Sequence, residues 1–288
     1  MRLRGFVVDM VKQVDPQKVN LHTHSYYCGH GIGEVSEYVE VAKRDGLEVL
    51  GFSEHCPTLD NRWHGSRMYF DRLEQYLAQC RDLQVQHDDI TLLVGLECDY
   101  THQYHNWYKE YLLEAGRVDY LISGVHYLTT DTVTDRYIKH FPNDVKALHL
   151  YTDQYIETLM SGLFTIGVHP DLFGMFYLSW DEEAKACSAS ILECAASLHI
   201  PLEINGYGLN KPKINTKSGM RYQYPLIDFW ELSKNYDIKI VANSDAHRPQ
   251  DVKKQVDDAH LFARELDLTL SPIRIETCAN GKVNLSFR

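Results

Sequence analysis

Seven short apolar runs, rich in β-branched residues, recur along the chain, and histidines or acidic residues stand at their ends. The runs occupy residues 18–22, 48–53, 90–97, 119–125, 164–168, 201–205 and 238–243. Helical patterns, with apolar residues spaced three and four apart, occupy residues 34–45, 70–83, 182–199 and 250–266. Strands that alternate with amphipathic helices predict parallel strands joined by right-handed crossovers. Seven such units predict an α/β fold with a closed or nearly closed barrel.

The C-terminal stretch has a different pattern. Residues 272–287 contain two extended runs around Asn280–Gly281, a dipeptide typical of a β-hairpin turn. We expect this hairpin to pack as an edge or a lid on the bottom of the barrel, without a catalytic role. Because no linker or low-complexity tract divides the chain, we expect residues 1–288 to form a single barrel domain.

The composition excludes several classes of function. A net charge of −11 disfavours nucleic-acid binding, which needs a basic face. The first residues lack a secretory signal, and no run approaches the ~18–20 apolar residues of a membrane helix. We therefore expect a cytoplasmic protein without a membrane partner, either a monomer or a homodimer. The seven cysteines are odd in number and include no CxxC pair, so reduced thiols are expected.

Two pairs of residues indicate a metal site. His22 and His24 stand two apart at the first run, and Asp245 and His247 do so after the last run. Side chains two apart on a strand face the same side. Since the first and last strands of a closed barrel are neighbours, we expect the four side chains to meet. Imidazole and carboxylate groups at such density bind divalent transition metals.

Three long loops, 55–69, 98–110 and 205–225, are candidates for a substrate-binding mouth. The first two carry Trp63, Tyr69, Tyr100, Tyr104, Trp107 and Tyr108. These rings either wall a substrate cavity or pack as ordinary loop residues, and the sequence leaves both interpretations open. Eight histidines outside the strand ends are expected to lie outside the site: His64, His87, His102, His105, His140, His149, His199 and His260.

The motifs LHTHSYYCGH, GFSEH, GLE, SGVH, GVHPD and NSDAH resemble the motif series of the polymerase and histidinol phosphatase (PHP) superfamily, from about residue 18 to about residue 250. The resemblance implies a distorted, TIM-like (β/α)7 barrel that holds up to three divalent ions, such as Zn, Fe or Mn. It implies one group of ligands formed by His22, His24, Glu97 and Asp245, a second formed by His30, His55 and His247, and a third in which Glu97 is shared with His126 and His169.

A further stretch, LEINGYGLNKP…YP, resembles the LEINTxGLRKP…YP loop of histidinol-phosphate phosphatases. This implies hydrolysis of a small-molecule phosphate ester, L-histidinol phosphate, to L-histidinol and phosphate in histidine biosynthesis. Asn210 stands where that loop has arginine. Lys211, Arg221 or Arg248 is expected to contact the phosphate instead, although a lysine lacks the guanidinium fork.

Glu203 and Asn205 share one face of the sixth predicted strand. One interpretation is that they bind the ammonium or imidazole group of the substrate. The other is that Glu203 is a carboxylate of the barrel interior, held by a nearby cation.

We predict a hydrolase in which a metal-bound hydroxide attacks the phosphorus in line, with the general acid unassigned. One alternative is a phosphoesterase of the same fold that acts on a nucleotide, a sugar phosphate or a phosphotyrosine. A second is a metal-dependent amidohydrolase, which also uses an HxH pair and a late aspartate on a barrel. A third is a non-enzymatic metal-binding or polymerase-accessory module. His30 and the SEH motif disfavour the amidohydrolase, and the complete ligand set disfavours the non-enzymatic module.

Overall fold

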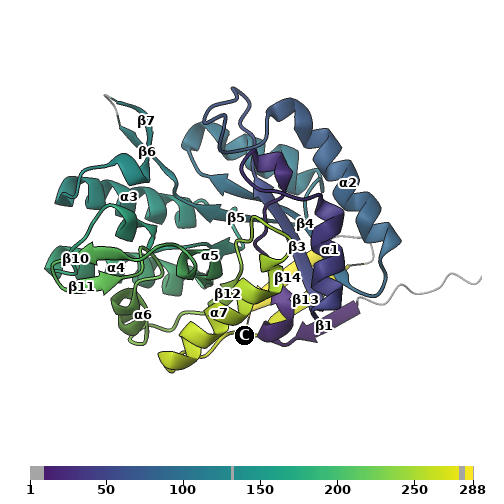
Figure 1. Ribbon diagram of the computed structural model, residues 1–288. Helices are drawn as coiled ribbons and strands as arrows, with labels where there is room; N and C mark the ends of the chain where they lie inside the picture. Colours follow the sequence, from purple (N-terminus) through teal and green to yellow (C-terminus); the bar gives the residue numbers. More distant parts are fainter. Residues whose placement is uncertain (1–9, 131–132, 279–282, 288) are drawn as a thin grey trace, which may run out of the picture.

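The computed structural model describes residues 10–130, 133–278 and 283–287. Its centre is a seven-stranded sheet with the order β12-β9-β8-β5-β4-β3-β2, in which every neighbouring pair is parallel (Figure 1). The strands are β2 (Val19–Asn20), β3 (Val49–His55), β4 (Thr91–Asp99), β5 (Tyr120–Gly124), β8 (Ile166–Gly167), β9 (Leu202–Asn205) and β12 (Ile240–Asn243). Each strand overlaps one of the seven predicted runs, so the predicted α/β class with parallel strands is confirmed.

The two edge strands of this sheet meet beyond their C-terminal ends, which makes the sheet a nearly closed barrel. Thr23 forms an isolated parallel bridge with Ala246. Beside it, the His24 amide donates to the Ala246 carbonyl at 2.8 Å, and the Asp245 amide donates to the His22 carbonyl at 2.8 Å. The residues that flank this bridge are the members of the HxH and DxH pairs. The expected meeting of the two pairs is therefore confirmed, although regular β2 ends before His22.

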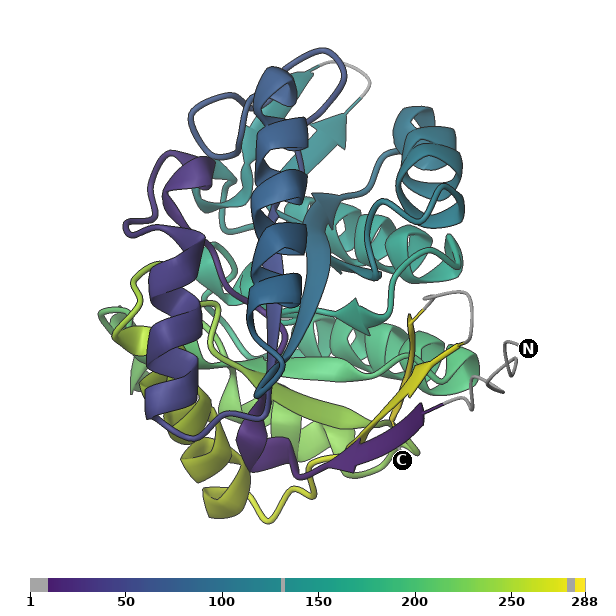
Figure 2. The same ribbon diagram turned by 90° about the vertical axis from the view of Figure 1, so that its right-hand side faces the viewer.

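Helices cover the outside of the barrel. They are α1 (Val35–Arg44), α2 (Leu73–Gln86), α3 (Val145–Met160), α4 (Glu182–Leu198), α5 (Gly206–Leu209), α6 (Ile227–Ser233) and α7 (Asp251–Glu265), with a π-helical segment at Trp107–Glu114. The periodicity predicted α1, α2, α4 and α7, but it did not predict α3 or α6. Asp144 and Asp181 begin α3 and α4 by accepting hydrogen bonds from the first-turn amides. In Figure 2, α1 and α2 lie side by side against the sheet.

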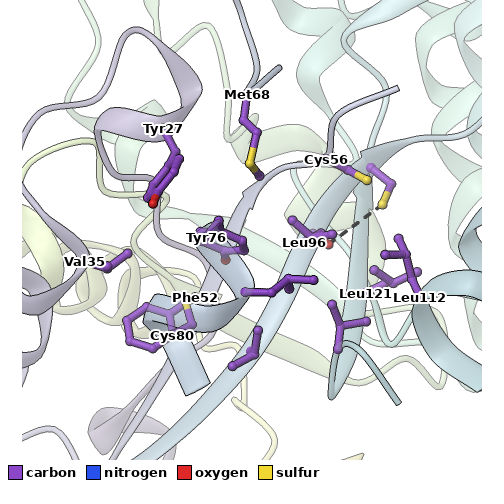
Figure 3. Packing of buried hydrophobic residues seen from close by; sticks show 14 of the residues in the cluster. Tyr27, Val35, Phe52, Cys56, Met68, Tyr76, Cys80, Leu96, Leu112 and Leu121 are labelled. Carbon is purple, nitrogen blue, oxygen red and sulfur yellow. Dashed lines mark hydrogen bonds between the residues drawn. The ribbon is translucent and has the colours of Figure 1, made fainter. Parts of the chain in front are cut away.

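The apolar layer between the helices and the sheet consists of residues that alternate along the strands. On the side of α1 and α2, Phe52 of β3 and Leu96 of β4 belong to this layer (Figure 3). Val35 of α1 joins them, together with Tyr76 and Cys80 of α2. Full burial of a large apolar side chain contributes roughly 1.5–3 kcal/mol. The intervening strand residues face the barrel interior, where the site lies.

Tyr120 fills much of the barrel interior below the site. Its hydroxyl donates to the Leu21 carbonyl at 2.8 Å. A Cβ atom at Gly51 would lie 2.1 Å from the Tyr120 hydroxyl, and one at Gly95 would lie 2.5 Å from its ring. Only glycine at these two positions leaves room for the ring. The tyrosine closes the interior, so that polar chemistry is confined to one end of the barrel.

A second sheet closes the opposite end. It contains β1 (Met10–Val14), β13 (Ile273–Thr277) and β14 (Val283–Phe287), paired antiparallel in the order β1-β13-β14 (Figures 1 and 2). Val14, Ile273 and Ile275 share one apolar cluster with Val19 and Val49, which stand at the starts of barrel strands. The C-terminal hairpin is thus confirmed as a lid on the barrel bottom, and β1 adds an unpredicted strand. The expected turn at Asn280–Gly281 lies outside the described residues.

Two further antiparallel hairpins were not predicted. One consists of β6 (Tyr127–Thr130) and β7 (Val133–Tyr137), which follow β5 and lie at the top of Figure 1. The other consists of β10 (Ile214–Thr216) and β11 (Gly219–Arg221), which follow β9 and α5 within the predicted long loop 205–225. Both hairpins therefore belong to segments that leave the C-terminal ends of barrel strands.

The structure also describes the state of the cysteines and the character of the helices. All seven cysteines are free thiols, so the expectation of reduced cysteines is confirmed. Among the helices that the structure describes, none combines the length and the apolar character that a bilayer crossing requires.

Candidate metal centre and substrate cavity

Glu97, at the end of β4, is the central anion of the site. Its Oε1 lies 2.9 Å from His169 Nε2 and 3.7 Å from His126 Nε2. Its Oε2 lies 2.9 Å from His55 Nδ1, because the parallel register pairs His55 of β3 with Glu97. A Cβ at Gly124 would lie 2.1 Å from His169 Cε1, so glycine at this position lets the His169 ring reach Glu97. The third ligand group expected from the resemblance is thus brought together.

The first expected ligand group is formed where the two edge strands meet. His24 Nε2 lies 3.1 Å from Asp245 Oδ1, and His22 Nε2 lies 3.5 Å from the same atom. Glu97 Oε2 lies 3.4 Å from His24 Nε2 and 3.5 Å from His22 Nε2. Asp245 has a φ of 55°, a left-handed conformation that aspartate tolerates better than most residues. Two imidazoles and two carboxylates therefore face one point.

The second expected group lies at the outer side of the cluster. His30 Nε2 and His247 Nε2 are 2.9 Å apart, and the ring centres of His30 and His55 are 5.3 Å apart. The sulfur of the buried Cys28 lies within 4.8 Å of ring nitrogens of His30 and His247. This group thus has one more potential ligand than the sequence analysis proposed. All nine predicted ligand residues lie in the same cluster.

The cluster contains buried polar atoms that have no hydrogen-bond partner among the described residues. They are His22 Nε2, both ring nitrogens of His24, His55 Nδ1, Glu97 Oε2 and His169 Nδ1. Although His55 Nδ1 lies close to Glu97 Oε2, the two atoms are not aligned as a hydrogen bond. An unpartnered buried polar atom costs about 1–3 kcal/mol. Imidazole nitrogens and carboxylate oxygens in this arrangement fit divalent cations, which would satisfy the atoms that face them, one nitrogen of each ring.

The protonation of the ligands differs from ring to ring. Burial lowers the pKa of His22 and of His24, but the surrounding carboxylates outweigh it and raise both pKa values, that of His24 to about 9, so that a metal ion would displace protons from these two rings. Burial and the neighbouring His24 lower the pKa of His55 well below its ordinary value, and they lower the pKa of His247 to about 3. Both rings are therefore neutral and keep the lone pairs that a metal ligand needs. Burial opposes ionisation of Glu97, but the surrounding histidines outweigh it and hold its pKa well below the ordinary value. Glu97 is therefore a carboxylate.

Two further carboxylates, Asp99 and Glu54, support the histidines from behind. Asp99 Oδ2 lies 3.2 Å from His126 Nδ1, and Asp99 Oδ1 accepts from the His126 amide at 2.6 Å. Glu54 Oε1 lies 3.4 Å from His24 Nδ1. Contacts of this kind fix the orientation and the tautomer of a ligand histidine. Their sequence signal is the strand end, where Glu54 precedes His55.

Glu203 and Asn205 lie beneath the cluster and do not line the cavity described below. The buried Glu203 carboxylate lies 2.9 Å from His22 Nδ1, and it accepts from Asn205 Nδ2 at 2.9 Å and from Asn243 Nδ2 at 3.0 Å. Asn205 Nδ2 also donates to Asp245 Oδ2 at 3.1 Å. This placement corrects the expectation of a substrate contact and favours a barrel-interior carboxylate that orients His22.

A cavity of about 410 Å³ opens at the cluster. It is lined by His30, His55, Gly65, Ser66, Arg67, His126, Tyr127, Tyr137, His140, Leu172, Tyr207, Lys211, Tyr224, Asp245 and His247. Five of the predicted ligands are therefore exposed to it, and four tyrosines form much of the remaining wall. Among the described lining residues, Asp245 is the only carboxylate.

Of the three cations expected at the phosphate, only Lys211 lines this cavity. Its Nζ lies 4.0 Å from the ring centre of Tyr207. Burial lowers the pKa of Lys211, and the negative charge of Asp245 opposes this effect.

Arg221 lies outside the cavity, and its guanidinium donates to four backbone carbonyl oxygens at 2.6–3.4 Å. Arg248 is exposed outside the lining. Asn210 also faces away, because its amide donates to Gly206 and Asp258. The expectations for Arg221 and Arg248 are therefore corrected.

The aromatic wall differs from the expected one. None of the six aromatic residues singled out in loops 55–69 and 98–110 lines the cavity. Tyr69 is exposed and the other five pack in the apolar core, so the interpretation as ordinary packing is correct. The rings that line the cavity are Tyr127, Tyr137, Tyr207 and Tyr224.

His140 also lines the cavity, although it was expected outside the site. It belongs to the turn Ile138–His140, which follows the hairpin β6–β7. The sequence offered no signal for it, because it does not stand at the end of a barrel strand. Tyr207 and Tyr224, in contrast, fall in the long loop 205–225 that was a candidate for function.

Comparisons with known proteins agree with this site and fold. The PHP domain family model matches residues 20–206. A probable histidinol-phosphatase of Deinococcus radiodurans is 30% identical over 244 residues, which cover 83% of this chain and 89% of the relative. The histidinol-phosphatase of Bacillus subtilis is 26% identical over 264 residues, which cover 82% of this chain and 96% of the relative.

A solved structure shares the same fold. It is the histidinol phosphate phosphatase of Lactococcus lactis in complex with zinc, L-histidinol and phosphate, and it superposes with a TM-score of 0.68 at 18% identity, covering 93% of this chain and 99% of the other. This similarity supports the TIM-like (β/α)7 barrel. With a family match over most of its length and a relative at 30% identity, the chain belongs to the PHP domain family, within its histidinol-phosphatase group of enzymes.

Proposed function

We propose that this chain is a metal-dependent phosphomonoesterase that hydrolyses L-histidinol phosphate to L-histidinol and phosphate. The observation that supports this most is the convergence of nine imidazole and carboxylate side chains at a cavity that also carries Lys211. Phosphomonoester hydrolysis is among the slowest uncatalysed reactions, so a site for it must supply much positive charge. The names of the similar proteins support histidinol phosphate as the substrate.

The residues that would hold the ions fall into the three groups already described, two of which share Glu97. When bound, divalent ions would supply Lewis acidity that neutralises phosphate oxygens and makes water a stronger acid at neutral pH. Imidazole and carboxylate ligands accept Zn, Fe or Mn, and the Lactococcus structure contains zinc.

The rest of the cavity wall would bind the substrate. Lys211 places a positive charge beside the cluster, where it would attract and orient the phosphate. Tyr207 and Tyr224 also line this wall, and aromatic rings suit the imidazole ring of histidinol phosphate. The four tyrosines of the wall would also limit the water around the reacting group.

Replacement of Glu203 by glutamine is expected to weaken metal retention by about 10- to 100-fold, because Glu203 orients His22 from behind. Since Glu203 does not line the cavity, kcat/KM should fall by the same factor for histidinol phosphate and for an aryl phosphate. Metal content after dialysis and kinetics on both substrates test this. Glu193→Gln, on the exposed face of α4, is the control. A rise in KM confined to histidinol phosphate would instead indicate direct substrate contact.

The proposed function is tested by kcat/KM for a panel of substrates. The purified protein, loaded separately with Zn, Mn or Fe, is assayed with histidinol phosphate, a sugar phosphate, a nucleoside monophosphate, phosphotyrosine and an N-acyl amino acid. We expect histidinol phosphate to exceed the other esters by at least about tenfold. If another ester has the highest kcat/KM, that ester and not histidinol phosphate is the substrate. Hydrolysis of the N-acyl amino acid, without phosphate release from any ester, would overturn the proposal that the protein is a phosphatase.

A further inference from the structure

The cavity holds a second strong cation, Arg67, which the sequence analysis did not single out. We propose that Arg67 contacts the phosphate group of the substrate and provides the guanidinium that position 210 lacks in this chain. The inference rests on the proposed phosphatase function for the identity of the ligand. Arg67 follows β3 in the loop 55–69, whereas Asn210 follows β9, so the two residues reach the site from different parts of the barrel.

The guanidinium of Arg67 is buried but belongs to the cavity wall, with only 3% of the residue exposed. Its Nη2 donates to Asp99 Oδ2 at 2.7 Å, and its Nη1 donates to the Cys56 carbonyl at 3.1 Å. A guanidinium has five N–H donors. Its Nε has no hydrogen-bond partner among the described residues. That Nε is buried, but Nη1 and Nη2 each donate only one of their two N–H groups to the partners above, which leaves a second N–H on each for an anion in the cavity that Arg67 lines.

Aromatic rings hold this guanidinium in place. Trp63 and Tyr127 are stacked, with ring centres 5.0 Å apart and an angle of 13° between their planes. The Arg67 Cζ lies 4.7 Å from the Trp63 ring centre and 5.7 Å from that of Tyr127. Cation–π contacts and the bond to Asp99 restrict the side chain before any ligand binds. A preorganised guanidinium loses less entropy on binding an anion than a mobile one.

The position of Arg67 relative to the metal-ligand cluster suits a phosphate contact. Asp99, which accepts from Arg67, also lies 3.2 Å from Nδ1 of His126. His126 Nε2 in turn lies 3.7 Å from Glu97 Oε1. The guanidinium is thus beside the outer side of the third ligand group. Phosphate oxygens that do not face the ions would find a bidentate donor there, which Lys211 cannot offer.

The experiment measures the affinity of the zinc-loaded, full-length protein for inorganic phosphate by titration calorimetry, with zinc content determined in parallel. Arg67→Met is expected to weaken phosphate binding by about 10- to 100-fold with zinc retained. Arg67→Lys keeps the positive charge but loses the two-pronged guanidinium, so its phosphate affinity should lie between those of Arg67→Met and the wild type. Arg62→Met is the matched control, because Arg62 also lies over the Trp63 ring, at 5.7 Å, but does not line the cavity.

Phosphate affinity within about twofold of the wild type in Arg67→Met, at full zinc content, would overturn the proposal and leave Arg67 a purely structural partner of Asp99. If Arg67→Met does not fold or loses zinc, the proposal is tested by the phosphate affinity of Arg67→Lys and by the structure of a wild-type crystal soaked in phosphate. In that crystal a guanidinium nitrogen should lie about 2.7–3.2 Å from a phosphate oxygen, and a separation beyond about 4 Å would overturn the proposal. Phosphate binding through Arg67 without hydrolysis of histidinol phosphate would overturn only the proposed function.

Discussion

Replacement of Glu97 by glutamine is expected to release bound metal and to lower kcat by at least about a thousandfold, equivalent to about 4 kcal/mol. The two Glu97 oxygens face five imidazoles, and this residue is shared by two of the three ligand groups. A neutral amide removes the central negative charge. It also puts an N–H donor where a cation would lie.

The measurements for this variant are elemental analysis of the dialysed protein and steady-state kinetics with histidinol phosphate. Glu48→Gln is the control, since Glu48 forms an exposed ion pair with Lys18 and lies away from the cavity. Surface ion pairs of this kind contribute about 0–1 kcal/mol, so activity and metal content should not change. Full turnover by Glu97→Gln with an unchanged metal stoichiometry would contradict the assignment of the site.

Removal of metal by a chelator is expected to abolish phosphatase activity and to lower the melting temperature. Once the ions leave, buried polar atoms on His22, His24 and Glu97 would have no partner, and this would lower the stability of the folded protein. A ligand held at a hundred times its dissociation constant stabilises the folded state by about 2.7 kcal/mol. For a chain of this size, that corresponds to a fall on the order of 5–10 °C in the melting temperature.

Scanning calorimetry and activity assays before and after chelation test this prediction, and adding back zinc should restore both. Glu97→Gln serves as the matched control, because a protein that has already lost its metal should not respond to the chelator. A melting temperature and an activity that are both insensitive to chelation in the wild type would show that the cluster holds no exchangeable ion.

The barrel and its ligand cluster could be predicted because their signals are local and repeated. Each strand is a short apolar run, and in a parallel sheet all C-terminal ends point to one mouth. A histidine or carboxylate at a strand end, such as His55 or Glu97, therefore has its position determined by the strand itself. The register that pairs these two residues directly was not predicted and comes from the structure.

The wall of the cavity could not be predicted in the same way. Lys211, Arg221 and Arg248 were equivalent cations in the sequence, but packing directs only Lys211 into the cavity. Backbone carbonyls engage Arg221, and Arg248 remains exposed. Which loop side chain reaches a cavity depends on contacts between segments that are distant in the chain, and these leave no periodic pattern.

The sequence by itself determined the seven barrel strands, four of the helices and the residues that meet at the ends of the strands, because hydrophobic periodicity and strand direction constrain them. The tertiary structure decided which groups surround a bound substrate. It buried Glu203 behind His22, and it brought Arg67 and His140 to the cavity from loops with no strand-end signal. The reason is physical: a strand positions its own residues, whereas a loop residue is positioned by whatever packs against it.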